Sequence, residues 1–289
     1  MTDLIDQSAL YPIREVSRLT GIKPITLRAW ERRYDLLEPV RTSSGHRLYT
    51  QEHIDFLNEA LRLMDEGIPI SRVKAVLSEP QTRKPEEATQ HNLSDDSALI
   101  EKICLAVNQF QIQNLERLLD RLFADYSING MLNLLAEIEQ HLKKQQNQPI
   151  NVAFWRTSLL RRLNVRLHSL QTQPMLPNKR IFIQKAGQTP DWIAKLVALF
   201  CFEQGYQPIQ LDEGVALENL IEVTKPLAFN TMIFIDSTGS ATLEWKLWFK
   251  HYSSMRTWVF GNHMLAEQRA PSVNCELRAW PQWFTPLGL

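Results

Sequence analysis

The chain has 289 residues, of which 44% are apolar and 22% charged, and its 32 basic residues balance its 32 acidic ones. A chain of this size and composition buries a real core and has room for about two domains, which excludes a disordered chain and a disulfide-stapled mini-protein. No apolar run approaches the roughly 20 residues of a membrane span, and the first ten residues lack the basic start and apolar stretch of a secretory signal, so we expect a cytoplasmic protein with no membrane contact.

A helix-turn-helix pattern occupies residues 11–34. Residues 11–19 predict a short helix, residues 20–22 a turn, and residues 23–34 a second helix with proline in its first turn. Leu27, Trp30 and Tyr34 share one face of the second helix, which places Trp30 in the core. The opposite face is free either for solvent or for a DNA groove, and it carries Thr26, Arg28, Arg32 and Arg33.

A basic hairpin is predicted after this second helix. Residues 41–49 form two short extended pieces around a polar turn that contains Gly45, with Arg41 and Arg47 on either side. Residues 11–50 hold eight basic residues against four acidic ones, a compact positive excess. Guanidinium groups beside a recognition helix reach DNA phosphates while the helix reads base edges. The pattern therefore predicts a winged helix-turn-helix.

Helical patterns dominate the next hundred residues. Thr50 is expected to cap a helix whose apolar residues recur as far as Met64, and residues 70–77 predict a further short helix. Residues 81–96 are polar and lack apolar periodicity, so they are interpreted as a linker. Helical periodicity then covers residues 97–142 and 152–170, interrupted at Pro149, which predicts a helical bundle.

The stretch LRAWERRYDLLEPVRTSSGHRLYTQEHI, residues 27–54, combines the elements LRxWE, LLxPxR and GxRxY. With these elements, residues 11–78 resemble the DNA-binding domain of the MerR family of transcriptional regulators, in the MlrA-like branch that also contains cobalamin-binding photoreceptor regulators. The resemblance implies a homodimer, or a higher homo-oligomer, on an inverted repeat in double-stranded promoter DNA. Activation by distortion of the promoter, so that RNA polymerase engages it, is the expected outcome.

The resemblance also assigns contacts to this chain. Each recognition helix is expected in a major groove and each wing against the backbone. The DNA-binding positions that it implies are Thr26, Arg28, Arg32, Arg41, Gly45, His46, Arg47 and Tyr49.

The cysteines argue against a metal sensor. Cys104, Cys201 and Cys275 lie far apart and have no metal-ligand spacing, so we expect reduced thiols in the core. Metal-sensing MerR members carry cysteines in and after a long dimerisation helix. Here no cysteine precedes Cys104 and no long heptad pattern follows Leu77, and we expect no bound metal.

From Arg180 onward, short β-rich runs alternate with helical stretches. Strands are expected at 181–184, 208–211, 231–236 and 257–261, and helices near 191–203, 215–223 and 240–252. This alternation predicts a flavodoxin-like parallel α/β domain. Five of the eight tryptophans lie in its last 50 residues, either in an exposed patch that favours oligomerisation or beneath sheet-covering helices; they are Trp245, Trp248, Trp258, Trp280 and Trp283.

The predicted division of the chain is thus a multidomain α and α/β arrangement. It comprises an N-terminal tail (1–10), a winged helix-turn-helix domain (11–80), a linker (81–96), a helical bundle (97–172) and an α/β domain (173–289).

The order of bundle and α/β domain resembles the cobalamin-binding module of the photoreceptor branch. In that module a histidine in the loop after the first strand is the lower ligand of cobalt. Aligned on its glycine turns, this chain has Pro190 at the histidine position and Ile193 at the following glycine position. Phe154 and Trp155 stand near the place of a Glu-His pair that covers the upper face of cobalt. We therefore expect a cobalamin-like fold with no cofactor.

Two roles for this module stay open. It is either a scaffold for oligomerisation or partner contact, or part of a one-component sensor whose altered pocket binds a small molecule other than cobalamin. The candidate pocket residues are Phe154, Trp155, Pro190, Trp192 and Ser237, although the aromatic ones equally fit as infill. The chain has no GxSxG elbow, paired metal-ligand motif or phosphate loop, so we do not expect an enzyme.

Overall fold

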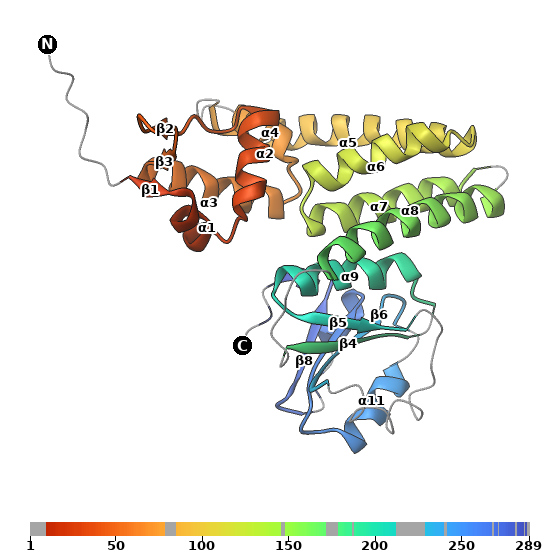
Figure 1. Cartoon of the computed structure of the whole chain (residues 1–289). Coiled ribbons are helices and arrows are strands. Elements are labelled where there is room, and N and C mark those ends of the chain that lie inside the picture. Colours follow the sequence, from red (N-terminus) through yellow and green to blue (C-terminus); the bar gives the residue numbers. More distant parts are fainter. Residues whose placement is uncertain are drawn as a thin grey trace, which may run out of the picture. The chain divides into compact units, whose positions relative to one another are not determined.

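The computed structural model describes residues 10–78, 85–145, 148–171, 179–186, 188–211, 229–239, 242–267, 269–270, 272–280, 282–285 and 287 (Figure 1). It divides into two compact units. The first consists of Met1–Lys102 with Asp120–Leu134, and the second of Ile103–Leu119 with Leu135–Leu289.

Four short helices form most of the first unit: α1 (Ile13–Thr20), α2 (Pro24–Tyr34), α3 (Gln51–Asp65) and α4 (Ile70–Ser78). Gly21, with φ of 75°, ends α1 in the left-handed conformation that glycine adopts at little cost, and Pro24 begins α2. Thr50 caps α3 as predicted, because its hydroxyl accepts from the His53 amide while His53 Nδ1 accepts from the Thr50 amide.

A three-stranded antiparallel sheet accompanies these helices, in the order β1-β3-β2. β2 (Val40–Arg41) and β3 (Arg47–Tyr49) form the predicted hairpin, with Arg41 opposite Arg47. β1 (Tyr11–Pro12) pairs with the other edge of β3, where the sequence analysis expected helix. Proline at the second position of β1 explains the difference, because the helix begins only after it.

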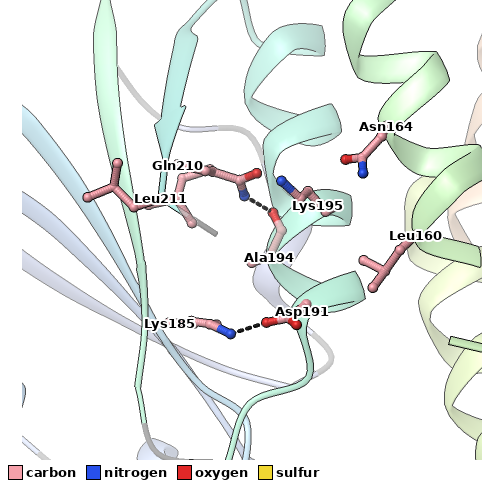
Figure 2. Close-up of a pocket in the computed structure, with 9 residues that line it drawn as sticks. Leu160, Asn164, Lys185, Asp191, Ala194, Lys195, Gln210 and Leu211 are labelled. Atoms are coloured by element: carbon pink, nitrogen blue, oxygen red, sulfur yellow. Dashed lines mark hydrogen bonds and ion pairs between the residues drawn. The ribbon is translucent and has the colours of Figure 1, made fainter. Parts of the chain in front are cut away.

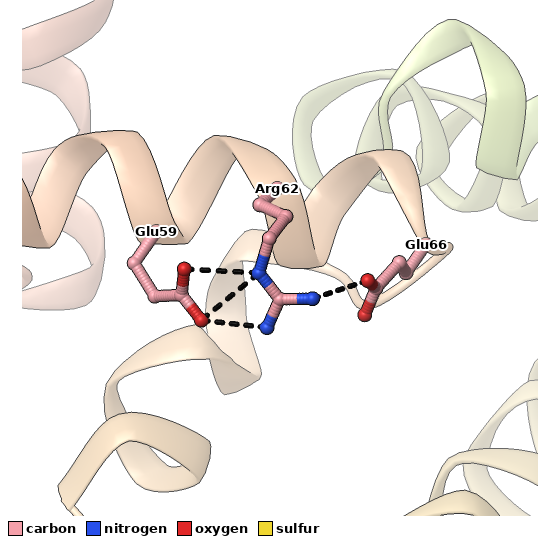
Figure 3. A network of polar contacts seen from close by, with 3 residues as sticks. All are labelled: Glu59, Arg62 and Glu66. Atoms are coloured by element: carbon pink, nitrogen blue, oxygen red, sulfur yellow. Dashed lines mark hydrogen bonds and ion pairs between the residues drawn. The ribbon is translucent and has the colours of Figure 1, made fainter.

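The outer face of α3 carries an ion-pair network (Figure 3). Arg62 donates from Nε and Nη2 to Glu59, at 3.0 and 2.6 Å, and from Nη1 to Glu66. All three side chains are at least two-fifths exposed. Exposed pairs of this kind contribute little stability, so the inner face with Ile54, Leu57 and Leu63 holds α3 in the core.

The region predicted as a linker is partly helical. Residues 81–84 lie outside the described residues, but α5 extends over Pro85–Asn108 and so includes most of the segment. Proline at the first turn, followed by two glutamates, favours a helix start. Sequence periodicity missed this part of α5 because its residues are polar and form no apolar stripe.

Three more helices follow: α6 (Ile112–Asp125), α7 (Ile128–Lys143) and α8 (Gln148–Gln171). The helical region 97–142 is therefore broken near Phe110 and again at Tyr126–Ser127. Phe110 has a positive φ of 52°, which ends the α5 turn. Pro149 lies in the first turn of α8 and starts that helix, rather than interrupting the helical region as predicted.

The second unit contains a five-stranded parallel sheet in the order β5-β4-β6-β7-β8 (Figure 1). Its strands are β4 (Arg180–Lys185), β5 (Gln207–Gln210), β6 (Thr231–Asp236), β7 (Arg256–Gly261) and β8 (Cys275–Ala279). All six residues of the central strand β6 are buried, as expected for a strand covered on both faces. β8 was not predicted because CELRA carries polar residues at two of its five positions and forms no β-rich run.

Helices flank this sheet. α9 (Asp191–Glu203) packs against β4 and β5 on one side and α8 on the other, and ten of its thirteen residues are buried. α11 (Thr242–His251) precedes β7, and the short 3-10 turns η1 (His263–Glu267) and η2 (Gln282–Phe284) flank β8. The helix predicted near 215–223 lies outside the described residues.

Core side chains settle two predictions. Cys104, Cys201 and Cys275 are buried and unpaired, as expected. Burial raises the pKa of the Cys104 thiol to about 11 and that of Cys275 to about 12. Trp248, Trp258 and Trp283 are at most 2% exposed, so these tryptophans form core and not an exposed patch.

In the described part of the chain, no helix is both long and apolar enough to cross a bilayer.

Candidate nucleic-acid interface

Helix α2 presents a basic outer face. Leu27 and Trp30 are buried in the core of the first unit, which confirms the predicted position of Trp30. Arg28 and Arg32 are exposed, and Thr26 is half-buried. Ile25, which the sequence analysis did not select, is 73% exposed in the first turn of α2. The helix therefore offers guanidinium groups and one apolar side chain on the face that does not pack.

A carboxylate on α2 holds the basic hairpin. Glu31 accepts from Arg47 Nε at 2.6 Å and Nη2 at 3.1 Å, and from Arg41 Nη2 at 3.0 Å. The Glu31 side chain is only 18% exposed, whereas Arg41 is 55% and Arg47 28% exposed. The hydrogen bonds that Arg47 donates to Glu31 raise the pKa of Arg47 above its usual range. The two strand arginines thus fix the hairpin to α2 and leave part of each guanidinium open to solvent.

The sequence analysis did not select Glu31, because it counted this residue only as one of the four acidic residues in 11–50. The spacing of ten residues to Arg41 and sixteen to Arg47 follows neither helix nor strand periodicity. Only the fold of the hairpin against α2 brings these three side chains together.

The hairpin turn is tightly hydrogen-bonded. The Gly45 amide donates to the Thr42 carbonyl at 2.9 Å, and the His46 amide donates to the Thr42 hydroxyl at 3.0 Å. Gly45 has φ of 81°, a conformation that a Cβ atom would strain. His46 is exposed beside it. The turn therefore presents His46 to solvent beside Gly45.

Tyr49, the last predicted contact residue, lies in the core. It is 2% exposed, and its ring lies edge-on to His53 with centroids 6.1 Å apart. Burial raises the pKa of its hydroxyl above the ordinary value. The structure therefore gives Tyr49 a packing position beneath the hairpin, whereas a direct DNA contact needs an accessible hydroxyl.

Pro190 and Ile193 are the residues that the sequence resemblance aligns with the cobalt-ligating histidine and the following glycine of cobalamin-binding modules. Pro190 is the N-cap residue of α9, with φ of −61°, and Ile193 is 7% exposed within that helix. A proline side chain has no donor atom for a metal, and the buried isoleucine fills space. These residues do not fit cobalt ligation.

The predicted pocket aromatics are engaged in packing. Trp192 donates from Nε1 to Glu139 Oε2 at 2.9 Å, and both side chains are buried. Trp155 is fully buried on α8, and Phe154 packs against Phe110 with ring centroids 5.1 Å apart. Of the two alternatives for Trp155 and Trp192, these contacts correspond to aromatic infill.

Glu139 is the centre of this contact between helices. Besides Trp192, it accepts from Arg156 on α8, with Nε at 3.2 Å, and from Lys143 Nζ at 2.8 Å. Burial alone raises its pKa, but the hydrogen bonds from Arg156, Lys143 and Trp192 outweigh burial, so the pKa lies below the ordinary value. α7, α8 and α9 are thereby joined through one buried carboxylate.

Ser237, the last of the candidate pocket residues, is also engaged in hydrogen bonds. Its amide and hydroxyl both lie within hydrogen-bond distance of Thr189 Oγ1, at 3.1 and 3.2 Å. Thr189 in turn donates to the Ile235 carbonyl at 3.1 Å. The loop before α9 is therefore hydrogen-bonded to the end of β6 and to Ser237, which follows it.

A cavity of about 230 Å³ lies elsewhere, between α8, α9 and the carboxyl ends of β4 and β5 (Figure 2). Its polar lining includes Asn164, Lys195 and the ion pair of Lys185 with Asp191. None of the five predicted pocket residues lines it. Among the described residues, no three His, Cys, Asp or Glu side chains gather in a way that fits a metal ion.

Comparison with known proteins finds a family match within the first unit. A family model described as MerR HTH family regulatory protein matches residues 11–80. Relatives include the HTH-type transcriptional regulator MlrA of Salmonella typhimurium (strain SL1344), 49% identical over 77 residues, which is 27% of this chain and 32% of that protein. MlrA of Escherichia coli (strain K12) is 53% identical over 70 residues, 24% of this chain and 29% of its own length.

A third relative is the HTH-type transcriptional repressor CarH of Myxococcus xanthus. It is 36% identical over 87 residues, 30% of this chain and 29% of that protein. The chain thus matches about a third of the length of these relatives, and the family match at residues 11–80 contains α2 and the hairpin.

Proposed function

We propose that this chain, whose residues 11–80 form a MerR-family helix-turn-helix domain, is a transcriptional regulator that binds an inverted repeat in promoter DNA as a dimer. The observation that carries the proposal is the exposed pair Arg28 and Arg32 on α2 beside a basic hairpin held by Glu31. α2 enters a major groove, and the hairpin is the wing that contacts backbone phosphates.

The residues divide into two roles. Arg28 and Arg32 are placed to meet base edges, because they share the unpacked face of α2, and the half-buried Thr26 in the first turn of α2 completes the proposed set. Arg41 and His46 are placed to meet phosphates, as is Arg47 through the part of its guanidinium that Glu31 leaves open, and Gly45 forms the turn that presents His46. Tyr49 supports the wing from below.

Activation through distortion of the promoter, with RNA polymerase as the second partner, is the mode that the family resemblance favours. Among the relatives, CarH is named a repressor, whereas the name of MlrA gives no sign of regulation. The operator supplies the two-fold symmetry, and a dimer of this chain supplies one recognition helix for each half-site.

The α/β unit serves as a scaffold for oligomerisation or partner contact. Its strand order β5-β4-β6-β7-β8 is the doubly wound order of flavodoxin-like folds, which supports a relationship to cobalamin-binding modules. Pro190 at the ligand position and the Glu139–Trp192 contact support a module without cobalamin.

A second candidate function is a small-molecule sensor. The cavity beside Lys185 and Lys195 supports this function, because it has open volume and polar walls. The predicted aromatic residues do not line it. The absorption spectrum of purified protein after incubation with cobalamins tests the scaffold role, which predicts a colourless protein. Retained cobalamin would contradict our interpretation of Pro190.

Two alanine variants test the DNA-binding proposal. Arg28→Ala should weaken binding by about tenfold and relax the preference for one base position. Arg41→Ala should weaken binding to all duplexes and reduce the slope of log K against log salt by about one. Fluorescence anisotropy with labelled duplexes at several salt concentrations measures both effects. If both variants kept wild-type affinity and slope, α2 and the hairpin would not be the interface.

A further inference from the structure

The turn between α6 and α7 belongs to the same compact unit as the DNA-binding helices. Residues 120–134 belong to the same compact unit as the DNA-binding head, by which we mean residues 11–78, although they follow α4 by more than forty residues. The Ser127 hydroxyl donates to the Met64 carbonyl at the end of α3, at 2.8 Å. A Cβ atom at Gly130 would lie 3.4 Å from the Gly67 Cα, so the two backbones approach closely. The turn is therefore docked against the α3–α4 connection.

The same turn holds the end of the recognition helix. Tyr34, the last residue of α2, donates from its hydroxyl to Asp125 Oδ1 at 2.5 Å. The Asp125 side chain is 7% exposed, and its second oxygen lies 3.5 Å from the Ser71 hydroxyl and 3.4 Å from Arg121 Nε. Burial and the bond to Asp125 raise the pKa of Tyr34 to about 12, so the tyrosine is a permanent donor at neutral pH.

The bond from Tyr34 to Asp125 is relevant to DNA binding because Tyr34 lies in the same turn of α2 as Arg32. Leu27 and Trp30 anchor the first two turns of α2 in the core, and in the last turn, which bears Arg32, the partly buried Tyr34 packs against the same core. The residue after α2, Asp35, has a left-handed conformation with φ of 48°, which a non-glycine residue adopts only when its surroundings hold it. Tyr34, Lys74, which bonds Asp35 Oδ2 at 2.7 Å, and the Glu31 pairs with the hairpin together fix this end of α2.

We propose that Asp125 is a positioning residue for DNA recognition: through Tyr34 it sets the orientation of the last turn of α2, and with it Arg32. The inference rests on the proposed DNA-binding function. Asp125 lies outside the segment 11–80 that the family resemblance covers, so the DNA-reading unit of this chain includes a residue from the helical region. α6 and α7 continue into the second compact unit, so the recognition helix is bonded to helices that extend beyond the head.

The test compares two matched tyrosine variants of the full chain. Tyr34→Phe removes the bond to Asp125, whereas Tyr126→Phe removes a bond of the same length, 2.5 Å, from the same turn to Asp96 without touching α2. For each variant, anisotropy gives the affinity for a duplex selected by the wild-type protein from a random pool and for a scrambled duplex of equal length, and urea unfolding gives the stability.

We expect Tyr34→Phe to lower the ratio of selected to scrambled affinity by about fivefold, the equivalent of about 1 kcal/mol, which is the typical net contribution of one hydrogen bond. Tyr126→Phe should leave the ratio at the wild-type value, even where it lowers stability. Asp125→Asn, which keeps an oxygen acceptor for Tyr34, should retain most of the ratio. An unchanged ratio in Tyr34→Phe, or an equal fall in both tyrosine variants, would overturn the proposal. Wild-type protein that selects no duplex would instead refute the DNA-binding function itself.

Discussion

Replacing Glu139 by glutamine tests the junction between the helical region and the sheet. The substitution keeps the size of the side chain and one oxygen acceptor for Trp192, but removes the charge that binds Arg156 and Lys143. Loss of one partner from a buried ion pair costs about 3–5 kcal/mol when the remaining charge stays buried. Arg156 and Lys143 are 39% and 54% exposed and regain water, so we expect a loss of about 2 kcal/mol.

Urea unfolding followed by tryptophan fluorescence measures this loss. Seven of the eight tryptophans lie in the second compact unit, so the signal reports mainly on that unit. With an m-value of about 2 kcal/mol/M, the midpoint should fall by about 1 M. Glu137→Gln is the matched control, because Glu137 is on the same helix but 53% exposed, and its ion-pair partner among the described residues is His141 at 3.9 Å. A control as unstable as Glu139→Gln would refute the reasoning.

The pH dependence gives a second check on Glu139. Its folded pKa lies below the ordinary value of 4.5, so its contribution is fully present above pH 4.5 and is lost as the pH falls through the folded pKa. The difference in unfolding free energy between wild type and Glu139→Gln should therefore shrink in acid. A difference that stays constant down to pH 3 would show that the carboxylate charge is not what stabilises the junction.

The remaining predictions concern the first unit. Glu31→Gln should release the hairpin and speed amide exchange in residues 40–49 by about fivefold, the equivalent of about 1 kcal/mol for partly exposed pairs; unchanged exchange would contradict the role of Glu31. Thr50→Ala should destabilise the head by about 1 kcal/mol through loss of the α3 cap, and Thr50→Ser should restore it, as measured by thermal unfolding. Burial lowers the pKa of His53, so head stability should be full above pH 6.5 and decline as the pH falls below it; a stability that rises in this range would be inconsistent with a neutral His53 in the cap.

Much of the fold was predictable because its signals are local. The cap at Thr50, Pro24 at the start of α2 and the glycine turn at Gly45 each determine a boundary through their own chemistry. The apolar runs of β4, β6 and β7 likewise predicted central parallel strands. By contrast, the first half of α5 has no apolar face, so periodicity did not detect a helix there.

The contacts that organise the candidate interface were not predictable in this way. Glu31 meets Arg41 and Arg47 only because the hairpin folds onto α2, and Asp125 meets Tyr34 across 91 positions of the chain. Tyr49 was misplaced because a sequence motif gives the position of a residue along a strand but not the depth of its side chain. The exposed arginines of α2 were correctly predicted, since their helix face follows from spacing to Leu27 and Trp30.

Selection of duplex DNA by the full chain from a random pool tests the central claim most directly. The account predicts enrichment of an inverted repeat whose two half-sites are related by two-fold symmetry, with binding that weakens as salt increases. The same pool offered to Arg28→Ala should give a weaker preference at one position in each half-site. No enrichment, or enrichment of a single asymmetric site, would contradict a dimeric regulator that reads DNA through α2.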